Sequence, residues 1–286
     1  MGKRILLLGH TGKMGLALTK TLSADNDLTG LNSRDFDAAD FARVTAIIDG
    51  LSPEIVINTV AFQGVDRCEQ EPEKAFRINT LFPGLLAGIC EERQSTFLHF
   101  STDAVFADVS ERFCTEDDLP APLNIYGVTK YGGDCLTASC CRQHYICRIP
   151  VLFGESRGEG QFVEKMTTRL RTEGTIRVAA DIVSSPSYSL DIARRVRDLL
   201  MDVAPYGTYH LANEGAASLY ELMLEIAANL VPGAVVERGS YRDFPFVGRK
   251  NLHTPLRSVR TDSLRPWREA VREYCHSLRT GGADHG

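Results

Sequence analysis

The chain has 286 residues, of which 43% are hydrophobic and 24% charged, and its formal net charge is −5. This ordinary globular composition excludes a disordered or fibrous protein. The acidic balance disfavours nucleic-acid binding, and no apolar run reaches the ~20 residues that cross a membrane. The short apolar run at the start lacks the length of a secretory signal. Eight cysteines without metal-ligand spacing favour free thiols in a cytoplasmic protein and predict no metal site.

Short apolar runs alternate with segments of helical periodicity in the first half of the chain. This alternation predicts an α/β fold, a Rossmann-type doubly wound parallel sheet with helices on both faces. We expect strands at residues 5–8, 28–31, 55–57, 96–100 and 145–149. We expect helices around 14–22 and 41–48, over 72–91 with a bend or interruption at Pro83, and over 126–144.

The regular alternation of strand and helix patterns ends after Pro150. This change predicts a smaller C-terminal α/β lobe that binds the substrate. We expect a dinucleotide-binding domain over 1–150 and a mainly substrate-binding lobe over 151–280, some segments of which return to the first domain. Residues 281–286 are expected to be a disordered tail. Further elements are predicted as helices at 162–171 and 190–201, a strand at 176–178, a capping box at 218–221 before another helix, and a last helix from 266–267.

Three glycines, Gly9, Gly12 and Gly15, follow the first predicted strand and precede the first predicted helix. Glycine permits a tight turn and lets the backbone approach a diphosphate, and the free N–H groups at a helix start attract anions. The Gly-x-x-Gly-x-x-Gly spacing is a weak signal by itself. Its place between an N-terminal strand and a helix favours a dinucleotide-binding loop over a simple turn.

The end of the second predicted strand discriminates between the two nicotinamide cofactors. An acidic residue there binds the ribose 2′-hydroxyl of NAD, whereas a nearby arginine suits the 2′-phosphate of NADP. The chain has Asn32 at this place, followed by Ser33 and Arg34. The pattern favours NADP(H), with NAD(H) also allowed. The alternative is that Arg34 is only a solvated surface charge.

Tyr126 and Lys130 stand four residues apart in a predicted helix and therefore share one helix face. A free phenol titrates near pH ~10, and a nearby cation lowers the pKa of a phenol because it favours the phenolate. In a ketone reduction, Tyr126 would protonate the nascent alkoxide while hydride adds to the carbon. Lys130 would also hydrogen-bond the nicotinamide ribose. The pair arises by chance often enough to need further support.

That support comes from Thr102, which lies just past the predicted strand over 96–100. The carboxyl edge of a parallel sheet is where ligands bind. The Thr102 hydroxyl would hydrogen-bond the substrate carbonyl oxygen and align it for Tyr126, and Ser101 is the competing candidate.

In this order, the glycine loop, the strand-end hydroxyl and the Tyr-x-x-x-Lys pair resemble the extended short-chain dehydrogenase/reductase superfamily. Within it, the chain resembles the dTDP-4-dehydrorhamnose reductase family over most of its length. The matching stretches are 9–15, 56–66, 76–79, 100–103 and 122–130, with weaker similarity at 185–187, at 209–211 and in the helix at Trp267.

The resemblance implies an NAD(P)H-dependent reductase of a 4-keto-6-deoxy nucleotide sugar, with hydride transfer to the C4 carbonyl and Tyr126 as the proton donor. It implies three catalytic residues, which are Thr102, Tyr126 and Lys130. It places Gly12, Lys13 and Met14 on the diphosphate, Asn32 and Asp37 near the adenosine, and Asn79 as a support of the lysine through water. The full set of implied cofactor contacts is Gly9, Thr11, Gly12, Lys13, Met14, Gly15, Asn32, Ser33, Arg34, Asp37, Ala61, Phe62, Gln63, Asn79, Tyr126 and Lys130. The implied substrate contacts are Thr102, Asp103, Val151 and Arg249, the partner is the nucleotide sugar, and a homodimer is allowed.

Several positions on the substrate side depart from the family pattern. Ala104 replaces a tyrosine, Val151 replaces a tryptophan, Ile182 replaces a glutamine, and Ser187 replaces a threonine. The hydride chemistry is therefore better supported than the rhamnose precursor as substrate. Residues 240–272 carry an excess of basic side chains, of which Arg249 or Lys250 is the candidate for binding the sugar-nucleotide diphosphate.

Two other functions remain open. A sugar-nucleotide epimerase or dehydratase has the same fold, although Ala104 counts against a dehydratase, which usually has glutamate there. A non-catalytic NADP-binding regulatory subunit is the alternative of a different class. Residues 148–155 resemble the corresponding segment of the regulatory beta subunit of methionine adenosyltransferase, and an intact catalytic set does not exclude this function.

Overall fold

Six parallel strands form the central sheet of the structure, a computed structural model that describes residues 2–157 and 160–280. The strand order is β10-β5-β4-β3-β1-β2, so the order reverses between β1 and β3. In open parallel sheets, ligands bind outside the carboxyl ends of the strands at such a point. The strands are β1 (Arg4–Leu8), β2 (Asp27–Leu31), β3 (Ile55–Asn58), β4 (Thr96–Thr102), β5 (His144–Ile149) and β10 (Gly207–His210).

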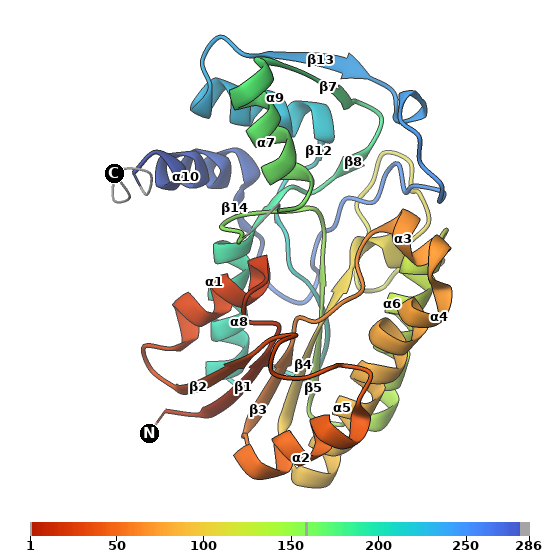
Figure 1. The fold of residues 1–286 in the computed structure, drawn as a ribbon, viewed down its shortest axis with the longest axis vertical. Helices are drawn as coiled ribbons and strands as arrows, with labels where there is room; N and C mark the ends of the chain where they lie inside the picture. Colours follow the sequence, from red (N-terminus) through yellow and green to blue (C-terminus); the bar gives the residue numbers. More distant parts are fainter. Residues whose placement is uncertain (1, 158–159, 281–286) are drawn as a thin grey trace.

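Helices cover both faces of this sheet (Figure 1). Ile5 and Leu7 of β1 face the core beneath α1 and α8, whereas Leu6 and Leu8 face the core beneath α2 and α5. Successive side chains of a strand point to opposite faces, so a strand covered on both faces needs an unbroken apolar run. The covering helices are α1 (Lys13–Leu22) and α8 (Ser189–Met201) on one face, and α2 (Phe41–Leu51), α5 (Phe82–Arg93) and α6 (Ile125–Cys140) on the other.

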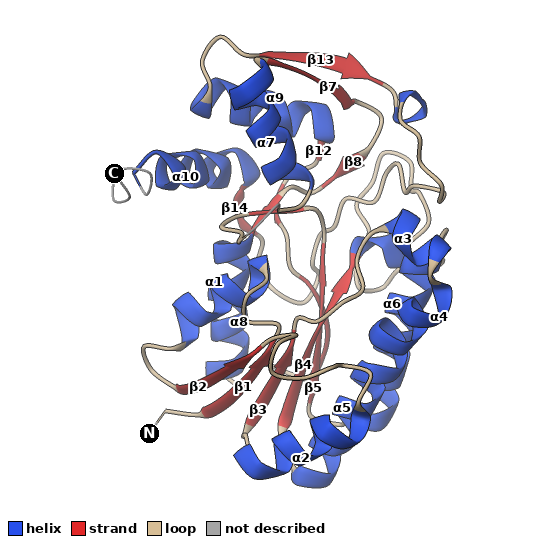
Figure 2. Cartoon of the chain, viewed as in Figure 1, coloured by secondary structure: helices blue, strands red, loops and turns tan. Residues whose placement is uncertain are grey.

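A smaller lobe lies beyond the carboxyl edge of the sheet (Figure 2). Its strands β7 (Thr175–Ala179) and β13 (Val235–Gly239) pair in parallel. Three helices pack with them around a separate core: α7 (Phe162–Glu173), α9 (Leu219–Leu230) and α10 (Trp267–Thr280). Short strands join the lobe to the sheet in three pairs: β6 (Leu152–Phe153) with β9 (Ser187–Tyr188), β8 (Val183–Ser184) with β12 (Ala217–Ser218), and β11 (Asn213–Glu214) with β14 (Leu264–Pro266).

Short helical segments complete the fold. They are α3 (Val65–Gln70), α4 (Pro72–Phe76), the π-helical segment η1 (Arg77–Leu81), and the 3₁₀ turns η2 (Asp103–Val105) and η3 (Tyr241–Asp243). Among the described residues, no helix combines the length and apolar character that crossing a lipid bilayer requires.

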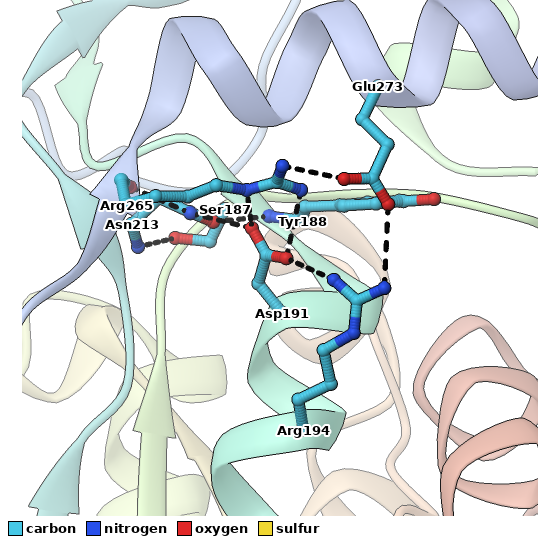
Figure 3. Close-up of polar contacts among 7 residues, drawn as sticks. All are labelled: Ser187, Tyr188, Asp191, Arg194, Asn213, Arg265 and Glu273. Atoms are coloured by element: carbon cyan, nitrogen blue, oxygen red, sulfur yellow. Dashed lines mark hydrogen bonds and ion pairs between the residues drawn. The ribbon is translucent and has the colours of Figure 1, made fainter.

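A buried polar network ties the smaller lobe to the sheet (Figure 3). Asp191, at the start of α8, is 6% exposed and accepts hydrogen bonds from Arg265 Nε at 2.8 Å and Arg194 Nη1 at 3.1 Å. Both arginines also pair with Glu273 of α10. Asn213 Nδ2 donates to Asp191 Oδ2 at 2.9 Å and to the Arg265 carbonyl at 2.9 Å. The network thus joins α8, α10, β11 and β14 where the two parts meet.

The expected elements form with a few differences. The fold class and the elements of the first half are confirmed, but α6 ends at Cys140 because Cys141 adopts an extended backbone, and β5 begins at His144. The expected interruption near Pro83 takes the form of the π segment η1, which precedes α5. The capping box of Ser218 and Glu221 is confirmed at the start of α9. Strand β10 was not expected, and the predicted disordered tail lies outside the described residues.

Candidate active site

The glycine loop connects β1 to α1 at the point where the strand order reverses. Gly9 has a φ of +85°, which favours glycine, and its N–H donates to the Leu31 carbonyl at 2.7 Å. A Cβ on Gly15 would lie 2.2 Å from the Gly9 carbonyl oxygen, so the turn requires glycine there as well. No side chain caps the start of α1, and its first turn carries no acidic residue. The exposed Gly12 and these free N–H groups fit a diphosphate.

Lys13, the first residue of α1, bridges to the smaller lobe. Its Nζ donates to the Leu152 carbonyl at 2.8 Å and lies 2.9 Å from Glu164 Oε1 of α7. Burial lowers the pKa of Lys13, and the neighbouring Glu164 carboxylate opposes this shift. A second contact links the two parts, since the Gln161 amide donates to the Gln63 side chain. Glu164 and Gln161 therefore contact the two segments that we expect to hold the cofactor, at Lys13 and Gln63.

Glu164→Gln is expected to lower the Kd for NADPH about tenfold, or about 1.4 kcal/mol. The substitution removes a negative charge beside the expected diphosphate and releases Lys13 to bind it, while the glutamine keeps an oxygen for the Gln161 N–H. Isothermal titration with NADPH measures the change. Glu173→Gln, at the other end of α7, is the matched control and leaves the Kd unchanged. Unchanged or weaker binding by Glu164→Gln would contradict the expectation.

The residues after β2 form a tight exposed turn. Asn32 Oδ1 accepts the Arg34 N–H at 2.9 Å, and Asp35 Oδ2 accepts the Asn32 N–H at 2.8 Å. The exposed guanidinium of Arg34 has no partner among residues 2–157 and 160–280. The Asp37 carboxylate accepts the Ala39 N–H at 2.8 Å and shapes the next turn. Arg34 is thus placed at the carboxyl end of β2 with its charge available to a phosphate.

The loop after β3 is fixed by Asn79. This asparagine is fully buried in η1, and its amide accepts the Phe62 N–H at 2.8 Å and donates to the Phe62 carbonyl at 3.0 Å and to Thr129 Oγ1 at 3.1 Å. The Phe62 ring packs in a small core next to Cys68 instead of lining the cleft. Asn79 therefore holds the loop of Ala61 and Gln63 to the helix α6 and does not itself face a cofactor.

Some of the other residues implied in cofactor binding have accessible side chains, and others are buried. Thr11 is partly exposed and Ser33 is exposed at the ends of β1 and β2, where both can reach a ligand. Met14 is 6% exposed and packs its side chain into the core, so only its backbone can face the diphosphate.

Thr102 is the last residue of β4 and is buried at the carboxyl edge of the sheet. Its Oγ1 accepts the Ala104 N–H at 3.1 Å and donates to Asp103 Oδ1 at 3.1 Å. The other oxygen of Asp103 accepts hydrogen bonds from Ser184 at 2.9 Å and Thr254 at 3.1 Å. Burial raises the pKa of Asp103, and these three hydroxyls oppose the shift. Asp103 therefore orients Thr102 and ties β4 to the smaller lobe.

Tyr126 lies in the first turn of α6, which Asn124 caps through the Gly127 N–H at 2.8 Å. Burial raises the pKa of the Tyr126 phenol, and the nearby Asp103 carboxylate raises it further, whereas a hydrogen bond with Thr102 lowers it. The expectation that the lysine makes this phenol acidic is thus wrong for the structure. The phenol stays protonated at neutral pH, as a proton donor must.

Lys130 points beneath β4. It is 2% exposed, and its Nζ donates to the Phe100 carbonyl at 2.6 Å and lies 3.2 Å from His99 Nε2. Burial lowers the pKa of Lys130 to about 8, and the Asp134 carboxylate opposes the shift. The structure thus brings Thr102, Tyr126 and Lys130 together at the end of β4.

The implied substrate residues surround this cluster from the smaller lobe. The Arg249 carbonyl accepts a hydrogen bond from Asn124 Nδ2 at 2.9 Å, which fixes the loop beside the start of α6. The exposed Arg249 guanidinium has no partner in the described part of the chain, whereas Lys250 Nζ is held by Asp66 at 3.0 Å. Arg249 is therefore better placed than Lys250 to meet a diphosphate. Val151 is partly buried between β5 and β6.

Three residues at the site were missed from the sequence. His10 packs its ring against Gly30, where a Cβ would lie 2.8 Å from His10 Cγ, and a glycine within a strand is a signal of such close approach. Glu164 reaches Lys13 from 151 positions away and leaves no local signal. His99 lies inside an apolar run and resembles an ordinary core residue. Within the described ranges, no group of three or more His, Cys, Asp or Glu side chains is arranged to hold a metal ion.

Comparison with known proteins agrees with this geometry. A family profile described as "RmlD substrate binding domain" matches residues 3–280. The chain is 30% identical over 276 residues to the spore coat polysaccharide biosynthesis protein SpsK of Bacillus subtilis, which covers 95% of this chain and 96% of that protein. It is 31% identical over 282 residues to the dTDP-4-dehydrorhamnose reductase of Mycolicibacterium smegmatis, with 96% of this chain and 85% of that protein covered.

A solved structure leads to the same result. The crystal structure of a dTDP-4-dehydrorhamnose reductase from Clostridium acetobutylicum superposes with a TM-score of 0.90 at 28% identity, covering 96% of this chain and 99% of that chain. The resemblance seen in the motifs is confirmed, and the chain belongs to the RmlD substrate binding domain family within the extended short-chain dehydrogenases/reductases.

Proposed function

We propose that this protein is an NADPH-dependent reductase of a nucleotide-linked 4-keto-6-deoxy sugar. The observation that carries the proposal is the convergence of Thr102, Tyr126 and Lys130 near the carboxyl end of β4, at the same edge of the sheet as the glycine loop. The names of the relatives support a nucleotide-sugar substrate, since several are dTDP-4-dehydrorhamnose reductases.

The glycine loop fits a dinucleotide. The uncapped start of α1 and the exposed Gly12 accept a diphosphate, and Arg34 supplies a free cation for a 2′-phosphate. NADPH is thus preferred and NADH is allowed. Lys13 and Gln63 would hold the cofactor once their contacts with α7 open. When bound, the nicotinamide supplies the hydride for the reduction.

The side chains of this protein supply the rest of the chemistry. When substrate binds, the Thr102 hydroxyl turns its one proton from Asp103 Oδ1 to the C4 carbonyl oxygen and holds that oxygen near Tyr126 Oη. As hydride reaches C4, Tyr126 transfers its phenolic proton to that oxygen, so the ketone becomes a secondary alcohol. The phenolate that remains takes a proton from solvent. Lys130, as the ammonium, supplies positive charge below the site, and it would have to turn from the Phe100 carbonyl to hydrogen-bond the nicotinamide ribose.

The smaller lobe binds the nucleotide sugar. Arg249, whose loop is attached to the start of α6, pairs with the diphosphate, because guanidinium groups bind phosphates through paired hydrogen bonds. Val151 lies next to the sugar at a position where a larger aromatic side chain is typical of the family, so the sugar pocket has a different shape. A cytoplasmic location and a homodimer stay predictions.

The test is NADPH oxidation in the presence of dTDP-, GDP-, CDP- and UDP-linked 4-keto-6-deoxy sugars. We expect turnover with at least one of them, and we expect NADH to be used less efficiently. Absence of turnover with all four, despite NADPH binding, would contradict the proposal and favour the regulatory-subunit function.

A further inference from the structure

A fully buried pair, Asn58 and His99, lies behind the amine of Lys130. Both side chains are 0% exposed, on the neighbouring strands β3 and β4. Asn58 Nδ2 lies 3.2 Å from His99 Nδ1, and His99 Nε2 lies 3.2 Å from Lys130 Nζ. The three side chains form a continuous polar chain within the buried interior. The mechanism above uses only the lysine, so the two residues behind it need an explanation.

The backbone fixes the direction of the hydrogen bonds along this chain. Asn58 Oδ1 accepts the Val60 N–H at 3.0 Å, so the Asn58 amide must present its NH₂ group to the histidine. An NH₂ group only donates, which makes His99 Nδ1 an acceptor. Burial and the adjacent Lys130 lower the pKa of His99, so the ring is neutral and carries its proton on the other nitrogen. His99 Nε2–H therefore points at Lys130 Nζ.

An N–H group that points at a lysine nitrogen stabilises one protonation state of the lysine and destabilises the other. The neutral amine has a lone pair and accepts the hydrogen bond, whereas the ammonium has only donors and meets a second donor. Lys130 Nζ also donates to the Phe100 carbonyl, so the amine has one acceptor and one donor around it. Inverting the histidine tautomer would only move the conflict to Asn58, where two donors would then meet.

The titratable and charged groups considered around Lys130 lie on three elements of the described structure. On α6, the Asp134 carboxylate favours the ammonium, and Tyr126 is neutral. On β5, Arg148 pairs with Asp134 at 3.1 Å and so reduces the effect of that carboxylate. On β4, His99 is the group in direct contact. Asp134 and His99 thus act on the lysine in opposite directions.

We propose that His99, oriented by Asn58, is a positioning residue for Lys130. His99 favours the amine form of Lys130 over the ammonium and holds Nζ at the Phe100 carbonyl. The inference rests on the proposed role of Lys130 in the reduction. Its consequence is that the lysine changes its charge within the working pH range, where it can exchange a proton during turnover.

The first test uses the cofactor-free protein and needs no substrate. Long-range ¹H–¹⁵N correlation spectra of histidine-labelled protein identify the protonated nitrogen, and the His99 signals are assigned from their loss in His99→Phe. We expect the proton on Nε2. A proton on Nδ1 would overturn the proposal.

The second test measures the pKa of Lys130 by NMR of labelled lysine side chains. His99→Phe removes the opposing N–H and is expected to raise this pKa by about one pH unit, as expected for one hydrogen bond. Asn58→Asp changes one atom, moves the histidine proton to Nδ1 and is also expected to raise the pKa of Lys130. Because Asn58→Asp keeps the size of the side chain, it preserves the test if His99→Phe fails to fold.

Thr137→Val is the matched control, since Thr137 is a fully buried polar residue of α6 outside the network. We expect it to leave the pKa of Lys130 unchanged. If neither His99→Phe nor Asn58→Asp shifts this pKa beyond the control, the pair only fills space and the proposal is wrong.

The pH profile of kcat separates this inference from the proposed function. The kcat of the wild type is expected to fall as the pH rises past about 8, where Lys130 loses its proton. In His99→Phe and Asn58→Asp, this fall in kcat is expected at a higher pH, by the same shift as the pKa of Lys130 measured by NMR. An enzyme that turns over with an unshifted limb would contradict the role of His99. Lack of turnover alone would contradict the proposed function and leave the NMR tests decisive for the histidine.

Discussion

Tyr126→Phe is expected to lower kcat about 10²–10⁴-fold for whichever nucleotide sugar is turned over. The substitution deletes a single oxygen, the one that would deliver the proton to the C4 alkoxide. The ring and its packing at the start of α6 are retained, so the Kd for NADPH is expected to stay the same. Stopped-flow measurement of NADPH oxidation separates the chemical step from binding and product release.

Tyr131→Phe is the control for this substitution, because Tyr131 lies one and a half turns further along α6 and is only partly buried. We expect it to keep wild-type activity. Wild-type turnover by Tyr126→Phe would remove the proton donor from the mechanism, and an equal loss in both variants would point to damage of the helix.

Asp191→Ala is expected to lower the free energy of unfolding by about 3–5 kcal/mol. The Asp191 carboxylate is 6% exposed and receives hydrogen bonds from Arg265, Arg194 and Asn213. Its removal leaves two guanidinium groups with Glu273 as their one carboxylate in the network, and it takes from the buried Asn213 amide one of its two acceptors. Urea denaturation followed by circular dichroism measures the loss.

Asp198→Ala tests the same chemistry at the surface of the same helix. Asp198 pairs with Arg197, and both side chains are about half exposed, so we expect a change within about 0.5 kcal/mol. If Asp191→Ala destabilised the protein no more than this control, the network of Figure 3 would not hold the two parts together.

Much of the fold could be predicted because the central sheet is buried on both faces. The runs at Ile5–Leu8 and Ile55–Ile57 have no other stable place than a covered strand, and both lie in the sheet. The glycine loop and the Tyr126–Lys130 pair can be recognised from their residue spacing. Their position at the carboxyl edge of the sheet then followed from the predicted fold. Strand β10 escaped prediction because Gly-Thr-Tyr-His has no apolar run and takes its order from pairing with β5.

The electrostatics of the site could not be predicted from spacing. The four-position spacing of Tyr126 and Lys130 places both on one helix face, but the direction of the lysine depends on the Phe100 carbonyl and His99 of another element. Likewise, the partner of Lys13 comes from α7, far along the chain. Long-range contacts of this kind decide the pKa of a buried group, and no local pattern reports them.

The clamp formed by Asn79 has a mechanical consequence. One amide links the loop after β3 to the helix α6, so the surface on which the nicotinamide would rest is fixed relative to the helix that carries Tyr126, the proposed proton donor. In the proposed mechanism, the distance between the nicotinamide and the phenol would then depend on this clamp and not on the smaller lobe. If the proposed function is right, substitutions in the smaller lobe would change which sugar is bound and leave the geometry of the chemical step intact.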